Sequence, residues 1–197
     1  MQTGSRFLSY PLVVVAMAIA IAAADRGLRA VGPRDAADLE SVVLSNPRVV
    51  VLKSARLLHL FDGDRLIRTY PVDLGQQPQG TKQIGVDRKT PEGRFRIVHQ
   101  NPVSPYARFL GLDYPDESAI ESGLSEGLIS VGQAESLRAA LRRGERPDWT
   151  TALGGGVGIH GRRRGDDWTG GCIAISDENM EELFRVLRIG DPVEILP

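Results

Sequence analysis

Cysteine, net charge and long apolar runs are all scarce in this sequence, and each scarcity excludes a class of protein. One cysteine among 197 residues cannot form a disulfide within the chain, so a disulfide-stapled scaffold is excluded. Lys and Arg number 24 against 25 Asp and Glu, whereas nucleic-acid-binding domains carry a marked basic excess. We therefore expect no nucleic-acid partner. A phosphate-binding loop is excluded too, because no Gly-Lys-Ser/Thr triplet follows the glycines at 154–156.

The longest apolar run lies near the N-terminus. It covers thirteen residues from Leu12 to Ala24, fewer than the roughly 20 that a membrane-spanning helix needs. Arg6 precedes the run, and three alanines stand before Asp25, as in a cleavable export signal. The pattern predicts a signal peptide over residues 1–24, with an uncleaved membrane anchor as the alternative. Both place the rest of the chain in the periplasm or cell envelope, with membrane contact only through this segment.

The remainder divides into a linker and one domain. Residues 25–47 predict a linker with one short helix, because Pro33 suits a helix start and Asn46-Pro47 a helix end. Residues 48–197 form the predicted domain. The chain is 42% hydrophobic, which is enough to bury a core.

The fold class follows from runs of β-branched and aromatic residues. Five predicted strands have the sequences VVVLK, RLLHLF, RLIRTYPVDL, RFRIV and PVEIL. Apolar spacing predicts a short helix after Pro115, a longer one over residues 130–143 and a third over residues 177–188. We expect an α+β, β-rich fold: a mostly antiparallel β-sandwich with a helical insertion and a C-terminal helix.

Residues 157–175, VGIHGRRRGDDWTGGCIAI, contain a candidate nucleophile and base. A cysteine attacks as its thiolate and needs a neighbouring base to take its proton. Cys172 and His160 are the candidates. Short apolar strands at 157–160 and 173–175 would hold the ends of the loop and bring the imidazole within reach of the sulfur.

Gly170 and Gly171 permit a tight turn before the cysteine. Their amides, with that of Cys172, could form an oxyanion hole. The alternative is structural, with Cys172 as a small buried apolar residue and His160 as a turn or core residue. Asp166 and Asp167 make a poor tetrahedral metal site with one histidine. We expect neither a metal nor another cofactor.

The pattern Ile-His-Gly, a short loop and then Thr-Gly-Gly-Cys-Ile resembles the active site of the YkuD-type L,D-transpeptidases, which cross-link or modify peptidoglycan. The segment KTPEGRFRI at residues 89–97 is similar to that family's Thr-Pro-x-Gly-x-Phe segment. The commoner family pattern has a second histidine two residues before the cysteine and often an arginine two after it. Gly170 and Ala174 occupy those places, and the form WTGGCIA is similar to a branch that lacks both groups.

The resemblance implies that the thiolate of Cys172 attacks a stem tetrapeptide at the carbonyl of its L-configured diamino acid and releases D-alanine. His160 would act as base and then as acid, oriented by a carbonyl near Thr169. The acyl group would pass to an amine acceptor. A hydrolase of the same fold, either an L,D-carboxypeptidase or an amidase detaching a wall-bound protein, is an alternative. So is a non-catalytic peptidoglycan-binding module.

The expected partners are peptidoglycan stem peptides, with a wall-attached protein as a further acceptor or substrate. A run of three arginines after the histidine predicts either a solvated surface or a site for anionic stem peptides. Trp168 either walls the pocket or fills the core. The expected substrate-binding residues are Thr90, Pro91, Arg162, Arg163, Arg164, Trp168 and Thr169.

Overall fold

The computed structural model describes residues 43–197. The predicted signal or anchor at residues 1–24 lies outside the described residues, as does most of the predicted linker at residues 25–47. Among residues 43–197, no helix combines the length and apolar character that crossing a membrane requires.

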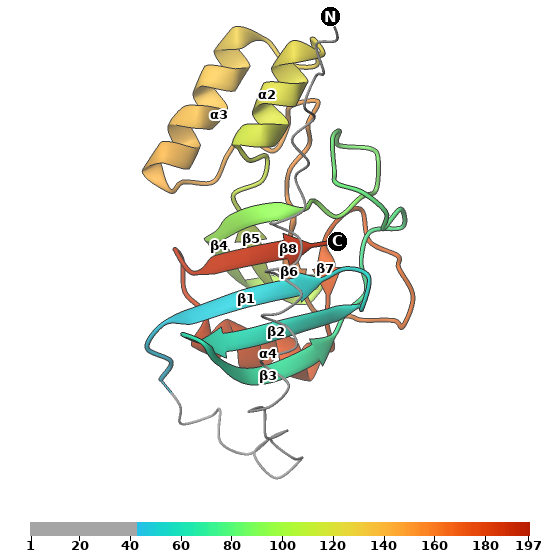
Figure 1. Ribbon diagram of the computed structural model, residues 1–197, viewed down its shortest axis with the longest axis vertical. Helices are drawn as coiled ribbons and strands as arrows, with labels where there is room; N and C mark the ends of the chain where they lie inside the picture. Colours follow the sequence, from blue (N-terminus) through green and yellow to red (C-terminus); the bar gives the residue numbers. More distant parts are fainter. Residues whose placement is uncertain (1–42) are drawn as a thin grey trace, which may run out of the picture. The chain divides into compact units, whose positions relative to one another are not determined.

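A single mixed sheet of eight strands organises the domain, in the order β3-β2-β1-β8-β4-β5-β6-β7 (Figure 1). Its strands are β1 (Pro47–Leu52), β2 (Leu57–Asp62), β3 (Arg65–Pro71), β4 (Gly93–Ser104), β5 (Ala107–Leu112), β6 (Gly158–His160), β7 (Ile173–Ala174) and β8 (Pro192–Leu196). Most neighbours are antiparallel, which confirms the predicted fold class, but β1 pairs with β8 and β6 with β7 in parallel. The sheet is therefore mixed.

The sheet changes partners along β4. Residues Gly93 to Arg96 pair with β8, and the remainder of the strand from Ile97 onward pairs with β5. All eight strands contribute buried apolar side chains to the main core, among them Val51, Leu60 and Ile159. Side chains alternate between faces along a strand, so Leu58 and Leu60 are fully buried whereas His59 between them bonds Thr69 Oγ1 at 2.8 Å.

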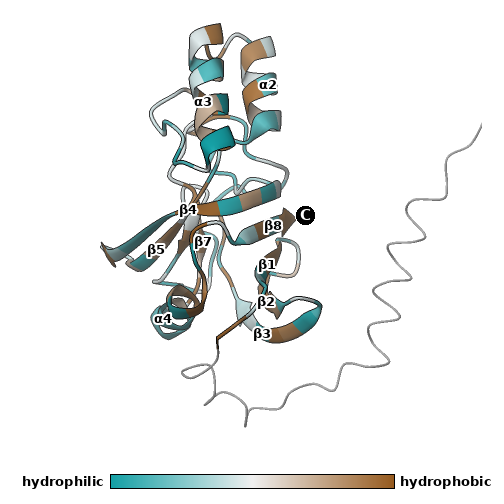
Figure 2. Cartoon of the chain, turned by 90° about the vertical axis from the view of Figure 1, so that its left-hand side faces the viewer, coloured by the Kyte–Doolittle hydropathy of each residue, from teal (hydrophilic) through white to brown (hydrophobic). Residues whose placement is uncertain are grey.

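The predicted helical insertion between β5 and β6 is present as α2 (Glu117–Ser125) and α3 (Val131–Arg143). Ser130 begins α3 with a reciprocal capping box, and Gly144 ends it in the left-handed conformation that glycine adopts readily. The two helices enclose a second, smaller core of Ile120, Ile129, Ala134, Leu137 and Leu153. They stand side by side beyond β4 (Figure 2).

The C-terminal helix α4 (Asp177–Val186) lies at the other end of the domain beside β5 (Figure 2), and it also contacts β6. The Ser176 side chain caps it, and Met180 and Leu183 enter the main core. The helix ends at Val186, two residues before the predicted end. It begins three residues after β7, so the strand that follows the cysteine is anchored from its C-terminal side.

Candidate active site

The pairing of β6 with β7 determines how the candidate base, His160, and the candidate nucleophile, Cys172, lie relative to each other. Ile159 pairs with Ile173 and His160 with Ala174. Both isoleucines are fully buried in the main core, and side chains alternate along a strand. His160 therefore points away from that core. Cys172, two residues before Ala174, shares its face on the neighbouring chain segment.

The sulfur of Cys172 is held by the backbone before and within β6. Its thiol donates to the Gly156 carbonyl at 3.3 Å, and the Gly158 amide donates to the sulfur. Cys172 is partly buried and not sealed in the core. Burial raises the pKa of its thiol to about 11, although the Gly158 amide and the charge of Lys82 act in the opposite direction. The resting sulfur is thus a protonated thiol at neutral pH.

His160 is oriented by the residue that follows it. Its Nδ1 lies 2.7 Å from the Gly161 carbonyl, and a carbonyl can only accept, so Nδ1 carries the proton and Nε2 is the basic nitrogen. Burial lowers the pKa of His160, with the bond to Gly161 opposing that shift. The imidazole is therefore neutral and able to accept a proton. The prediction that a carbonyl near Thr169 orients the imidazole was wrong, because the carbonyl that bonds Nδ1 belongs to Gly161.

Thr169 braces the loop that leads to the cysteine. Its hydroxyl donates to the Cys172 carbonyl at 2.7 Å and accepts from the Gly171 amide at 3.1 Å. Thr169 is almost fully buried, so its side chain is a loop support. The expected oxyanion role of the Gly171 amide needs correction, because that amide already donates to Thr169. The amides of Gly170 and Cys172 remain the candidate donors.

The three arginines after the histidine have different environments. Arg163 pairs with the buried Asp73 at 3.1 Å, and the same carboxylate accepts from the amides of Arg164 and Gly165. Asp73 therefore fixes the course of this loop. The side chains of Arg162 and Arg164 are the ones that remain as candidates for binding an anion.

Two aromatic residues flank the base. The Trp168 ring centroid lies 5.8 Å from that of His160, and the Tyr106 centroid lies 4.8 Å from it. Arg164 lies over the Trp168 ring, with its guanidinium carbon 3.8 Å from the ring centroid. Trp168 thus borders His160. Tyr106 was not identified from the sequence, because it lies in a turn far from the motif.

Thr90 and Pro91 are buried in the loop before β4. The Thr90 hydroxyl accepts from the Gly75 amide at 2.9 Å, and its carbonyl accepts from Lys53 at 3.0 Å. These bonds give Thr90 a role in shaping the loop. The neighbouring Lys89 carbonyl would lie 2.6 Å from a Cβ at Gly171, so this loop passes directly against the cysteine loop.

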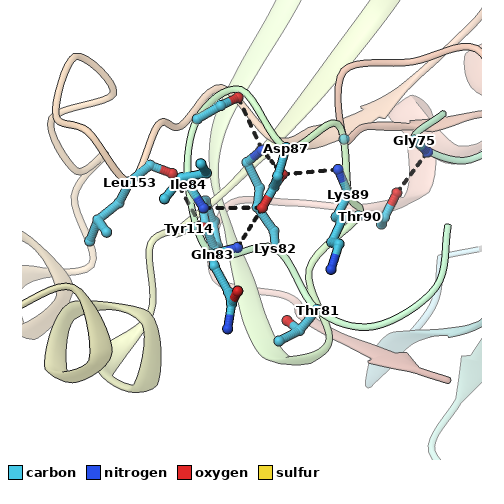
Figure 3. Close-up of polar contacts among 12 residues, drawn as sticks. Gly75, Thr81, Lys82, Gln83, Ile84, Asp87, Lys89, Thr90, Tyr114 and Leu153 are labelled. Atoms are coloured by element: carbon cyan, nitrogen blue, oxygen red, sulfur yellow. Dashed lines mark hydrogen bonds and ion pairs between the residues drawn. The ribbon is translucent and has the colours of Figure 1, made fainter. Parts of the chain in front are cut away.

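Sequence analysis also missed Lys82, a buried cation in the same loop (Figure 3). Its Nζ bonds Asp87 Oδ1 at 2.9 Å and the Gly85 carbonyl at 3.3 Å. A Cβ at Gly171 would lie 3.6 Å from this nitrogen. A lysine in a polar, turn-rich segment gives no sequence signal for burial. Within residues 43–197, no group of three His, Cys, Asp or Glu side chains is arranged to hold a metal ion.

Comparisons with known proteins identify the family. The L,D-transpeptidase catalytic domain model, YkuD, matches residues 46–195. No curated protein matches the chain. Solved structures with a similar fold include the helical cell shape determining protein from Campylobacter jejuni, with 23% identity, a TM-score of 0.50 and coverage of 77% of this chain and 48% of that one.

Two further similar structures are L,D-transpeptidases. The one from Xylanimonas cellulosilytica has 16% identity and a TM-score of 0.46, and the match covers 89% of this chain and 68% of that one. The one from Mycobacterium smegmatis has 14% identity and a TM-score of 0.45, with coverage of 77% and 59%. This chain thus spans about half to two thirds of the length of these structures. On the match of the catalytic domain model over most of its length, the chain belongs to the YkuD family of L,D-transpeptidase catalytic domains.

Proposed function

We propose that this protein is a cysteine-dependent L,D-transpeptidase that acts on peptidoglycan stem peptides. The observation that carries the proposal is the pairing of β6, which ends at His160, with β7, which begins directly after Cys172, together with the bond from Nδ1 of the imidazole to the Gly161 carbonyl. This arrangement supplies a nucleophile, a base and the group that orients the base. Export through residues 1–24 would bring the domain to the cell wall.

The proposed reaction starts from a neutral thiol and a neutral imidazole. His160 Nε2 takes the proton of Cys172 as the sulfur attacks the carbonyl of the L-configured diamino acid. The amides of Gly170 and Cys172 stabilise the resulting oxyanion. When the tetrahedral intermediate collapses, the C–N bond breaks, and His160 gives its proton to the departing amine of D-alanine. The product is a thioester on Cys172.

An amine acceptor then attacks the thioester. His160 takes a proton from the acceptor nitrogen, the C–S bond breaks and the proton returns to the Cys172 sulfur. The products are a new amide cross-link and the original thiol, so the enzyme needs no cofactor. The guanidinium groups of Arg162 and Arg164, beside Tyr106 and Trp168, would bind carboxylates of the stem peptide.

Hydrolysis is the second candidate, with water in place of the amine. The observation that favours it concerns Gly170, which is exposed and has no atom within 4 Å of an added Cβ. The approach beside the sulfur is thus open on this side, where the commoner family pattern has a histidine. The products would be trimmed stem peptides, or a wall-attached protein released from its link.

Mass spectrometry of tetrapeptide-bearing muropeptides tests these alternatives. Incubation with the purified protein should release D-alanine and create new cross-links. D-alanine release without cross-links would identify a hydrolase, and neither product would indicate a peptidoglycan-binding module. Cys172→Ala and His160→Gln are the comparison variants, with circular dichroism to check their folding. Full activity of Cys172→Ala would overturn the mechanism.

A further inference from the structure

The loop of residues 82–89 lies between the two chain segments that hold the sulfur of Cys172. On one side, a Cβ at Gly154 would lie only 2.5 Å from the Cα of Gly85, and the carbonyl of the nearby Gly156 accepts a hydrogen bond from the thiol. On the other side, the Lys89 carbonyl closely approaches Gly171. The loop therefore contacts the backbone on both sides of the nucleophile, and the charges inside it act at short range.

Two buried lysines hold this loop, and their bonding differs. The Lys53 ammonium donates three hydrogen bonds. Its acceptors are the Gly80 and Thr90 carbonyls at 2.6 and 3.0 Å and Glu92 at 2.7 Å. Lys82 has two acceptors among residues 43–197, Asp87 and the Gly85 carbonyl. A purely structural lysine would be expected to satisfy all its donors in a buried position. The incomplete bonding of Lys82, beside Gly171, points to a role at the cysteine.

Acidic side chains surround Lys82. Asp87 is its ion partner, and Glu92, Asp116 and Glu126 line the same cavity. The Asp87 carboxylate accepts four hydrogen bonds (Figure 3). One comes from Lys82 and the others from the amides of Gln83, Ile84 and Lys89. Burial acts to raise the pKa of the Asp87 carboxyl, but these bonds outweigh it, and the pKa is lowered. The Asp87 carboxyl is therefore ionised at neutral pH and faces Lys82 as an anion.

We propose that Lys82 is a positioning residue whose ammonium stabilises the thiolate of Cys172 as the thiol proton moves to His160. Lys82 exchanges no proton with the sulfur. Its charge offsets part of the cost of forming an anion in a buried site, a cost that the neutral imidazole cannot reduce before it accepts the proton. The inference extends the proposed function, on which it rests for its catalytic meaning, but it concerns the reactivity of the thiol itself.

The test is the pH dependence of Cys172 alkylation by iodoacetamide in the purified full chain. Lys82→Met should raise the apparent pKa of the thiol by about one unit, so that alkylation at pH 8 slows by about tenfold. Asp87→Asn leaves the lysine charge without its counter-ion and should change the rate in the opposite direction. Lys89→Met removes a charge from the same loop without touching the pair, and is the matched control, expected to alkylate within about twofold of the wild type.

Opposite shifts in the Lys82 and Asp87 variants cannot come from a loosened loop, which would change the thiol pKa in one direction. Unchanged alkylation in Lys82→Met, or a slower rate in both variants, would overturn the proposal. If Lys82→Met fails to fold, Asp87→Asn decides, since faster alkylation supports the proposal and equal or slower alkylation contradicts it. Alkylation needs no peptidoglycan, so a wild type that shows these shifts but releases no D-alanine overturns only the proposed function.

Discussion

Crowding on the face that carries His160 requires glycine at position 158. A Cβ there would collide with the Leu110 carbonyl and would lie 2.6 Å from the Phe109 ring. The same ring covers Gly111, where a Cβ would lie 2.9 Å from it. Phe109 thus packs against two glycines on neighbouring strands. This packing depends on the close spacing of β5 and β6, and β6 carries His160, the candidate base.

Gly158→Ala should therefore destabilise the protein by about 1–3 kcal/mol, because a methyl group has to displace backbone or an aromatic ring. Gly132→Ala is the matched control, since position 132 lies in α3 with nothing within 4 Å of an added Cβ. There the change should stabilise by about 0.5–1 kcal/mol through helix propensity. Urea unfolding of the two variants measures both effects. Equal stability in the two would contradict the crowding argument.

The motif residues could be predicted from the sequence at this scale, and their supporting partners could not. Cys172 and His160 lie in one short segment, so the sequence identified them together. Lys82 lies 90 positions before the cysteine, and only the folded loop brings it near. The carbonyl of Gly161 was missed for a different reason: every residue has a carbonyl, and side-chain types give no information on which one accepts.

At the scale of elements, Leu153 connects the helical insertion to the segment before β6. It is fully buried in the small core, where it packs against Gly123 of α2. Three residues further along the chain, the Gly156 carbonyl accepts a hydrogen bond from the Cys172 thiol. A short stretch of backbone thus connects the small core to the acceptor of the thiol.

Truncation of Leu153 to alanine should cost about 2–5 kcal/mol in stability and change the rate of Cys172 alkylation. Leu137→Ala removes an equal side chain from the same core, on α3 and away from the cysteine. It should cost a similar amount and leave alkylation less affected. Chemical unfolding and iodoacetamide kinetics on both variants provide the comparison. Identical alkylation changes would show that the connection through residues 153–156 is not specific.

Strand and helix positions were largely predictable, whereas strand pairing was not. Runs such as RLLHLF and the capped segment after Ser130 have local signatures, and they form β2 and α3 as expected. The pairs β1–β8 and β6–β7 are parallel. The sequence pattern of these segments is compatible with either parallel or antiparallel pairing. Their orientation is determined by the three-dimensional path of the chain, which local patterns do not contain.

For the whole molecule, the two titrating groups of the site predict how stability depends on pH. In the folded protein the pKa of the Cys172 thiol is raised to about 11, from an ordinary value of 9.0. Between these values the unfolded chain loses its proton first, so stability should fall as pH rises above about 9. His160 has a pKa below its ordinary value of 6.5. The unfolded chain therefore binds a proton first as pH falls through 6.5, and stability should fall there too.

Thermal or urea unfolding from pH 5 to pH 10.5 measures this dependence. Cys172→Ala should remove part of the alkaline loss and leave the acid side unchanged. His160→Gln should remove part of the acid loss only. An alkaline limb that is the same with and without the thiol would show that burial does not hold the proton on the sulfur.

The order of the strands has a consequence for assembly. The segment Pro192–Leu196 joins β1 to β4, although it comes after both of them and after the cysteine in the sequence. Until this segment is in place, β1 and β4 each have an edge without a strand partner, and the two parts of the sheet are not connected through backbone hydrogen bonds. Removal of this segment would therefore expose two strand edges in the middle of the sheet.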